Sequence, residues 1–346
     1  MKRIATLICA VLVLLSSLAL FACSSQTEAE GNGDDKKYFK VTFNSDGGSY
    51  VDEKNVGKGK TIPRPISPTK EGYIFSGWYE INEDGTVSGI PWNFELNTVS
   101  HDTALKAKWT LPDKVFVFAS NGDDKTATIT GVRDGIGGLI MELTLPEAIG
   151  GYNVTAIGNN AFEKLSSEDF TSITVPKNIT IIGDEAFYGS KDIKIVVEGQ
   201  LTSIGVRAFY DCNGLLSVNF GEGLERVTSE AFCGCSSLAA VSIPKSVKVI
   251  EENAFDSCTA LRSVTLYTDM EAVENMAFDE ATALKTLYFY GEETDIDNFL
   301  ENKVEFGNDT FLDAKVLVFS ETEPEKETAY GGYWYLDKNG KIKLWS

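Results

Sequence analysis

The chain has 346 residues, of which 43% are hydrophobic, so it is long and apolar enough for two or more domains. Its 31 lysines and arginines are outnumbered by 51 aspartates and glutamates, which gives a net charge of −20. This charge repels phosphate backbones and anionic lipid surfaces, and it argues against nucleic acid as a partner. It is typical of a soluble exported protein.

Residues 1–22 have the features of a lipoprotein signal peptide, because a basic start is followed by a long apolar run. The sequence Leu-Phe-Ala-Cys at 20–23 resembles the lipobox of bacterial lipoproteins, whose cysteine is lipidated and becomes the mature N-terminus. Cleavage after Ala19 is the alternative, and it would leave Cys23 as a free thiol. We expect lipidation of Cys23, which predicts a membrane-anchored lipoprotein at the cell surface. No Leu-Pro-x-Thr-Gly sorting signal is present, so Cys23 is the expected anchor.

Residues 23–37 are predicted to form a flexible linker. From residue 24 on they are rich in Ser, Gly, Glu and Asp, with no apolar side chain larger than Ala. A segment of this composition cannot bury enough surface to fold. It would act as a tether that lifts the following domains off the membrane.

Residues 38–110 are predicted to form a small β domain. Alternating apolar side chains at 39, 41 and 43 indicate a strand that ends at an Asp-Gly-Gly turn. With Gly-Tyr-Ile-Phe-Ser-Gly-Trp at 72–78 and Leu-Lys-Ala-Lys-Trp at 105–109, the segment closely resembles the internalin B-repeat, or Listeria–Bacteroides repeat. The resemblance implies a β-grasp-like module, often a spacer or adhesive module on bacterial surfaces. A domain of about 70 residues needs large core side chains, so four aromatic residues are interpreted as core and not as a sugar platform: Tyr73, Phe75, Trp78 and Trp109.

Residues 111–142 are predicted to form the N-terminal cap of a solenoid. Two short apolar stretches, at 115–118 and 127–131, read as strands. They stand directly before the first copy of a repeat, where a solenoid needs its open end covered.

Residues 143–319 contain a repeat whose anchor is an Ala-Phe pair. The phenylalanines are spaced by 25, 22, 23, 23 and 23 residues, and a fixed period of this size is typical of a solenoid. An apolar residue stands five positions before each phenylalanine, and an alternating apolar pair in each copy predicts a short strand. We expect the rings to form one interior column: Phe162, Phe187, Phe209, Phe232, Phe255 and Phe278.

The copies at 182–187 and 204–209 read Ile-Gly-x-x-Ala-Phe, and with Ser-Ile-Pro at 242–244 they resemble the BspA-type leucine-rich repeat of bacterial surface proteins. Later copies lose the glycine, and the period stretches over 279–311. Residues 320–346 resemble the aromatic tail that follows such arrays, and Trp334 and Trp345 are expected to plug the final coil after a last strand at 316–319. The predicted fold is mainly β: a leucine-rich-repeat solenoid with terminal caps, preceded by a small β-grasp-like domain.

Three cysteines occupy one position in successive coils: Cys212, Cys235 and Cys258. Their spacing of 23 residues is that of the repeat and not of a metal site. A small, weakly polar thiol suits a buried position, so we favour buried free thiols. A disulfide between adjacent coils is the alternative, since export permits it and the coil spacing is near the range that a bridge tolerates. Cys233 adds a fourth thiol to this region.

The sequence predicts no catalytic, metal or cofactor site. The single histidine, His101, falls in a predicted turn with no obvious nucleophile near it. Zinc sites built on paired histidines are excluded, and acidic pairs such as that at 123–124 lack the EF-hand spacing. We therefore expect a protein that is not an enzyme.

The outward positions of the strands provide a candidate binding face, since solenoids use such extended surfaces for binding and tyrosine is enriched at interfaces. Ordinary strand composition is the competing interpretation. The predicted function is adhesion to a protein or glycan on a host or neighbouring cell; capture of polysaccharide for neighbouring enzymes, and a passive surface spacer, are the alternatives. The candidate residues are Asn219, Thr265, Tyr267, Tyr288 and Tyr290.

Overall fold

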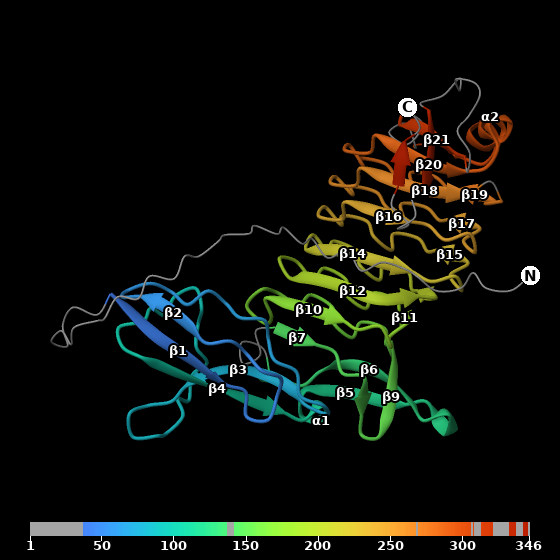
Figure 1. Ribbon diagram of the computed structural model, residues 1–346. Coiled ribbons are helices and arrows are strands. Elements are labelled where there is room, and N and C mark those ends of the chain that lie inside the picture. The colour runs from blue at the N-terminus through green and yellow to red at the C-terminus, as the bar shows by residue number, and fades with distance from the viewer. Residues whose placement is uncertain are drawn as a thin grey trace, which may run out of the picture.

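The computed structural model describes residues 37–136, 142–267, 269–305, 307, 313–320, 332–336 and 342–344. A small β unit lies beside the first coils of a solenoid that rises away from it (Figure 1). The predicted signal peptide, Cys23 and Trp345 lie outside the described residues. Within the described ranges, no helix has the length and apolarity that crossing a bilayer requires.

The first unit is a mixed four-stranded sheet in the order β2-β1-β4-β3, in which the central pair β1 and β4 is parallel. Val41, Leu105 and Trp78 form its buried centre. The sequence-based interpretation of Tyr73 as a core residue is wrong, because its ring is exposed and lies under the Lys70 ammonium, 4.8 Å from the ring centroid. The strands are β1 (Tyr38–Asn44), β2 (Lys54–Gly57), β3 (Ile74–Glu80) and β4 (Thr103–Thr110).

The predicted cap strands extend one side of the solenoid at its first coil. β5 and β6 form an antiparallel hairpin, and β6 pairs in parallel with β9, which continues into the coil strands β11 and β13. The open end of the core is thus covered by sheet, with buried Phe116 and Ile129 facing inward. The elements of this region are α1 (Pro112–Val115), β5 (Phe116–Ser120), the 3-10 turn Gly122–Asp124, β6 (Thr126–Val132), β8 (Ala148–Ile149) and β9 (Tyr152–Ile157).

Most coils contribute one longer strand and one short strand on different sides of the core, and strands of neighbouring coils pair in parallel within each sheet. The longer strands are β7 (Glu142–Thr144), β10 (Ser172–Val175), β12 (Lys194–Leu201), β14 (Leu215–Phe220), β16 (Ala240–Ser242), β18 (Ser263–Tyr267), β20 (Thr286–Tyr290) and β21 (Lys315–Phe319). The short strands are β11 (Ile181–Ile182), β13 (Ser203–Ile204), β15 (Arg226–Val227), β17 (Val249–Ile250) and β19 (Ala272–Val273). The ladders are interrupted in the middle of the array, because β14 and β16, and likewise β13 and β15, belong to different sheets.

The six repeat phenylalanines form the predicted interior column. Neighbouring ring centroids are 5.0–5.4 Å apart and the ring planes differ by 6–17°. All six side chains are buried. This spacing is slightly above the strand separation in a sheet, so the distance between successive coils determines the distance between the rings.

The turn before each phenylalanine is held in a left-handed conformation, which costs free energy for residues other than glycine. The main chain offsets this cost with bonds between coils: the Glu185 N–H donates to the Val206 carbonyl at 2.9 Å, and the Phe187 N–H donates to the Ala208 carbonyl at 2.8 Å. The left-handed residues, with φ of 53–57°, are Asn160, Glu185, Arg207, Glu230, Asn253 and Met276.

The four described cysteines are free, buried thiols. In three successive coils the Sγ donates to the carbonyl of a phenylalanine one coil earlier, as Cys235 does to Phe209 at 3.1 Å. Ser190 makes the equivalent bond to the Phe162 carbonyl at 2.6 Å. Burial raises the pKa of each thiol, and for Cys233 it does so to about 12, with Asp256 adding to the shift.

The stretched period has a structural cause, because the helix α2 (Glu293–Asn302) is inserted there. Its Phe299 is buried against Phe289, with centroids 5.3 Å apart. The expectation that 316–319 is the last strand is wrong, since β22 (Tyr333–Leu336) and β23 (Ile342–Leu344) follow in the same sheet. Trp334 of β22 is buried, but it packs against Tyr288, Tyr290 and Phe319 on the outer side of the sheet and not inside the final coil, where a plug was expected.

Candidate functional site

The predicted binding face is formed by the outer side of the longer strands. Asn219 is exposed on β14, and its Nδ2 donates to the Val197 carbonyl of the preceding coil at 3.1 Å. Thr265 does not face solvent freely, because only 8% of its surface is exposed. These two residues lie on strands of different sheets.

The three tyrosines do come together near the last coils. Tyr267 and Tyr290 are register partners on β18 and β20, and their rings stack at 4.6 Å with planes 4° apart. The Trp334 ring meets Tyr288 at 5.3 Å and Tyr290 at 4.6 Å, both edge to face. We name Tyr267, Tyr288, Tyr290 and Phe319, with Trp334 beside them, the aromatic patch.

The aromatic patch is half-buried and not fully exposed. Burial raises the pKa of Tyr290 to about 12, with a smaller effect of Tyr267, and burial likewise raises the pKa of Tyr267. Both hydroxyls are therefore neutral donors and acceptors at physiological pH. A half-buried, neutral, aromatic surface suits contact with a protein or with the apolar face of a sugar.

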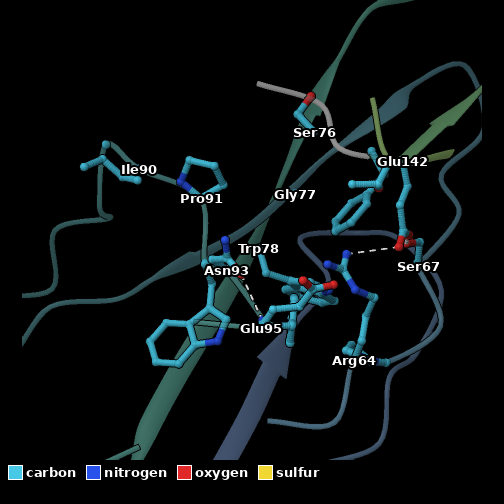
Figure 2. Close-up of a pocket in the computed structure, with 16 residues that line it drawn as sticks. Arg64, Ser67, Ser76, Gly77, Trp78, Ile90, Pro91, Asn93, Glu95 and Glu142 are labelled. Carbon is cyan, nitrogen blue, oxygen red and sulfur yellow. Dashed lines mark hydrogen bonds and ion pairs between the residues drawn. The ribbon is translucent and has the colours of Figure 1, made fainter. Parts of the chain in front are cut away.

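A second site lies at the junction of the two units, where β3 and β7 are in contact. A pocket of about 460 Å³ opens between the loop at 89–95 and the first coils (Figure 2). Many of its lining side chains are aromatic or aliphatic, and Arg64, Ser67 and Glu142 meet at one end. The lining includes Phe75, Trp78, Ile90, Pro91, Trp92 and Phe94.

The polar end of the pocket joins the two units. The Arg64 Nη1 donates to the Glu142 Oε1 at 3.0 Å, and the Ser67 Oγ donates to the other oxygen of Glu142 at 2.6 Å. Figure 2 shows Arg64 and Ser67 converging on Glu142 at the end away from Ile90. This pocket was not predicted from the sequence, because Ser67 and Arg64 are 75 and 78 residues from Glu142 and no motif connects them.

The structure places a hydroxyl and a carboxylate beside the one histidine of the chain, at an exposed position. His101 is exposed, with its Nε2 at 3.3 Å from Glu80 and its Nδ1 at 3.2 Å from the Ser100 hydroxyl. No group of three or more His, Cys, Asp or Glu side chains suited to a metal occurs among those same residues. The buried thiols are protonated at neutral pH and are poor nucleophiles.

The stacked coils, the phenylalanine column and the parallel strands define a leucine-rich-repeat solenoid. Its repeats match the family described as "BspA type leucine-rich repeat region (6 copies)" over residues 141–222 and 193–303. The first unit matches the Listeria–Bacteroides repeat domain over residues 39–108. The chain therefore contains both kinds of repeat that its sequence resembles.

Similar proteins share parts of this chain. A Gly-rich membrane protein of Evansella cellulosilytica is 31% identical over 158 residues, which cover 45% of this chain and 16% of that protein. Internalin H of Listeria monocytogenes is 34% identical over 76 residues, 22% of this chain and 13% of that protein. A leucine-rich repeat protein of known structure from Bacteroides ovatus is 23% identical, with 62% and 56% of the two chains covered and a TM-score of 0.44. The matches span a fifth or less of the length of these curated relatives.

Proposed function

We propose that this protein is a non-catalytic surface protein whose repeat array binds a protein or glycan of a host or neighbouring cell. Leucine-rich repeats of this class support a protein-binding role, and the names of the relatives, internalin and membrane protein, support a place at the membrane surface. Lipidation of Cys23 is the proposed anchor, and the predicted linker 23–37 separates it from the folded units.

The observation that carries the proposal is the aromatic patch on the outer side of the last coils. Tyr267 and Tyr290 present a flat, stacked pair that the coil register holds in place, so little side-chain entropy is lost on binding. Tyrosine pairs of this kind contribute large contact areas at interfaces, together with a hydroxyl that can bond a partner.

The test compares the mature protein with a variant in which Tyr267, Tyr288 and Tyr290 are all replaced by serine. We expect the wild type to bind a component of a matrix-protein panel or of a glycan array, and the variant to bind it at least about tenfold more weakly. The control replaces the exposed Tyr50 of the first unit with serine and should bind like the wild type. Unchanged affinity of a folded triple variant refutes this site.

Capture of polysaccharide for neighbouring enzymes is the second candidate, and the neutral hydroxyl groups of Tyr267 and Tyr290 favour it, because they can hydrogen-bond to sugar hydroxyls. A glycan array separates the two: binding only to glycans supports capture, whereas binding only to matrix proteins supports adhesion. Failure of both panels at high protein concentration supports a passive spacer.

The anchor is tested separately by replacing Cys23 with alanine in the full chain. We expect the wild type to partition into detergent with the membrane fraction, and the Cys23→Ala variant to lose its lipid mass and leave that fraction. A wild-type protein whose mature mass carries no lipid contradicts the proposed anchor.

A further inference from the structure

The junction pocket is bordered by aliphatic side chains that have little reason to be exposed. Ile66, Ile90 and Leu96 retain 91%, 78% and 77% of their surfaces, and each either lines the pocket or is adjacent in sequence to a residue that lines it. Single exposed apolar residues are common, but an exposed isoleucine that lines an apolar pocket, as Ile90 does, suits an interaction site.

The first wall of the pocket is rigid. The Trp92 N–H donates to the Trp78 carbonyl at 2.7 Å, which fixes the loop alongside β3. β3 has a register irregularity against β4 between Phe75 and Trp78, and Gly77 within it has a φ of 112°. A bulge of this kind opens the strand and leaves space beside it.

The rim of the pocket, formed by the turn at residues 93–97, is held by hydrogen bonds within the turn. The Asn93 Oδ1 accepts the N–H groups of Glu95 at 2.9 Å and Leu96 at 3.1 Å, and the Asn97 Oδ1 accepts the Asn93 N–H at 2.7 Å. The Asn97 N–H in turn donates to the Asn93 carbonyl at 2.8 Å. This closed turn presents Leu96 and the Glu95 carboxylate to solvent in a fixed arrangement, so a ligand need not order the loop on binding.

The charge of the site identifies the kind of partner. Arg64 and Glu142 neutralise one another at the inner end, whereas Glu95 at the rim makes no ion pair within the described part of the chain. The pocket therefore offers one net negative charge beside an apolar cavity, in a chain whose net charge is −20. A second copy of the chain is disfavoured by this like charge, while a cationic partner is attracted.

The carboxylate of Glu95 favours a cationic peptide over a neutral sugar, and the exposed Ile90 of the lining offers an apolar contact. Isoleucine and leucine side chains offer no hydrogen bonds to hydroxyl groups, but they pack well against apolar side chains. We propose that the junction pocket is a docking site for an extended segment of a partner protein in which an apolar side chain is flanked by lysine or arginine. The apolar side chain enters between Trp92 and Pro91, and the cation meets Glu95. This site is separate from the aromatic patch and does not depend on it.

The test uses isothermal titration of the folded protein with three synthetic peptides. The probe is acetyl-Gly-Ser-Lys-Leu-Lys-Ser-Gly-amide; in one matched peptide both lysines are replaced by glutamate, and in the other the leucine is replaced by serine. We expect the probe to bind at least about tenfold more tightly than either matched peptide. The glutamate peptide loses the charge contact, and the serine peptide loses the buried apolar side chain. Added salt should lower the affinity of the probe for the protein, because it screens the charge contact.

The protein variants assign the binding to the pocket. Glu95→Lys should invert the preference, so that the glutamate peptide binds more tightly than the lysine peptide, and Ile90→Ser should weaken the probe several-fold. Glu83→Lys, an exposed acid of the same unit, and Ile181→Ser, an exposed isoleucine of the solenoid, should leave binding unchanged. The exposed positions keep the variants folded, which an unchanged melting temperature verifies.

Three results would overturn the proposal: no binding of the probe at millimolar concentration, equal binding of all three peptides, or insensitivity to Glu95→Lys. Maltopentaose serves as the neutral sugar probe. If it binds and its binding is lost in Ile90→Ser, the pocket is a sugar site and the peptide proposal is wrong. The serine variant of the three tyrosines should retain full peptide binding, which separates this site from the aromatic patch.

Discussion

The two units of the chain use aromatic rings in opposite ways. In the phenylalanine column of the solenoid the rings stack face to face, as Phe209 and Phe232 do at 5.4 Å with planes 8° apart. In the first unit they meet edge to face, as Phe75 does with Trp78 and Trp109 at 5.5 Å and 63–65°. Isolated aromatic pairs favour edge-to-face or offset contacts. The solenoid rings instead have the orientation that repetition imposes, because every coil places the same side chain in the same conformation one strand spacing further on.

This difference shows that coil geometry, and not pairwise ring preference, arranges the solenoid core. In the first unit no repeat fixes the angles between rings. The rings fill a small core between strands of different sequence. The column should therefore depend mainly on volume, whereas the first unit should depend on ring shape. Four predictions concern the column, the thiols beside it and the junction with the first unit, in order of decreasing effect.

The largest effect is expected for Phe209→Ala, in the middle of the column. Removing a buried ring leaves a cavity between two others, and the free energy of unfolding should fall by about 3–5 kcal/mol. Phe209→Leu preserves much of the volume and should cost less than half as much if stacking itself contributes little. Urea denaturation measures both, and equal losses for the two variants would show that the ring contact is essential.

The next effect is a loss of stability at alkaline pH. In the unfolded chain a thiol ionises near its ordinary pKa of 9.0, whereas burial raises the folded pKa of Cys258 well above it and that of Cys233 to about 12. The stability from each raised pKa is fully present below pH 9 and is lost as the pH rises above 9 toward the folded value. Each thiol then contributes a loss of about 1.4 kcal/mol per pH unit. In Cys258→Ser the free energy of unfolding should fall less steeply above pH 9, by about 1.4 kcal/mol per pH unit. A slope identical to that of the wild type would contradict the raised pKa of Cys258.

A smaller effect is expected for Cys235→Val, which keeps the position apolar, adds about one methyl group and removes the thiol donor. The Phe209 carbonyl still accepts a hydrogen bond from the Cys212 N–H. Losing the bond from the Cys235 thiol should therefore cost only about 1 kcal/mol. Cys235→Ser can make the bond that Ser190 makes, and it should restore part of the loss. Thermal unfolding of the two variants measures the difference; a valine variant as stable as the wild type means that the thiol contributes by volume alone.

The smallest effect is expected for Arg64→Ala at the junction. The ion pair with Glu142 is partly exposed, so its loss should cost no more than about 1 kcal/mol and should vanish in 1 M salt. Lys40→Ala, which breaks the exposed pair with Glu53, is the matched control and should cost still less. Calorimetry at low and high salt distinguishes them. A large, salt-independent loss would show that Arg64 acts by packing on Phe94 instead.

The periodic part of the fold was predictable from the sequence because each repeated residue meets its own equivalent in the next coil. The spacing of Phe187, Phe209, Phe232 and Phe255 was enough to predict the column, since a period of 23 residues has one simple structural solution. The alternating pairs likewise predicted the longer strands. The approach of Tyr267 to Tyr290 follows from the same register.

Features that depend on contacts between unlike segments were not predictable. Arg64 and Glu142 belong to different repeat types, and no local pattern indicates that they meet. Helix α2 was missed because its short segment was interpreted as a stretched repeat. The degree to which Trp334 buries Tyr288 and Tyr290 also depends on β22, a strand that the sequence pattern did not indicate.

The bonds between the left-handed turns have one more consequence, which concerns distance. Because every turn bonds to the next in the same way, deleting residues 232–254 would join Ala231 to Phe255 and rebuild an Ala-Phe pair. The array would shorten by one rise of about 4.8 Å with both ends intact. The separation between the junction pocket and the aromatic patch is therefore adjustable in whole coils, and changes in coil number can match the two sites to partners of different span.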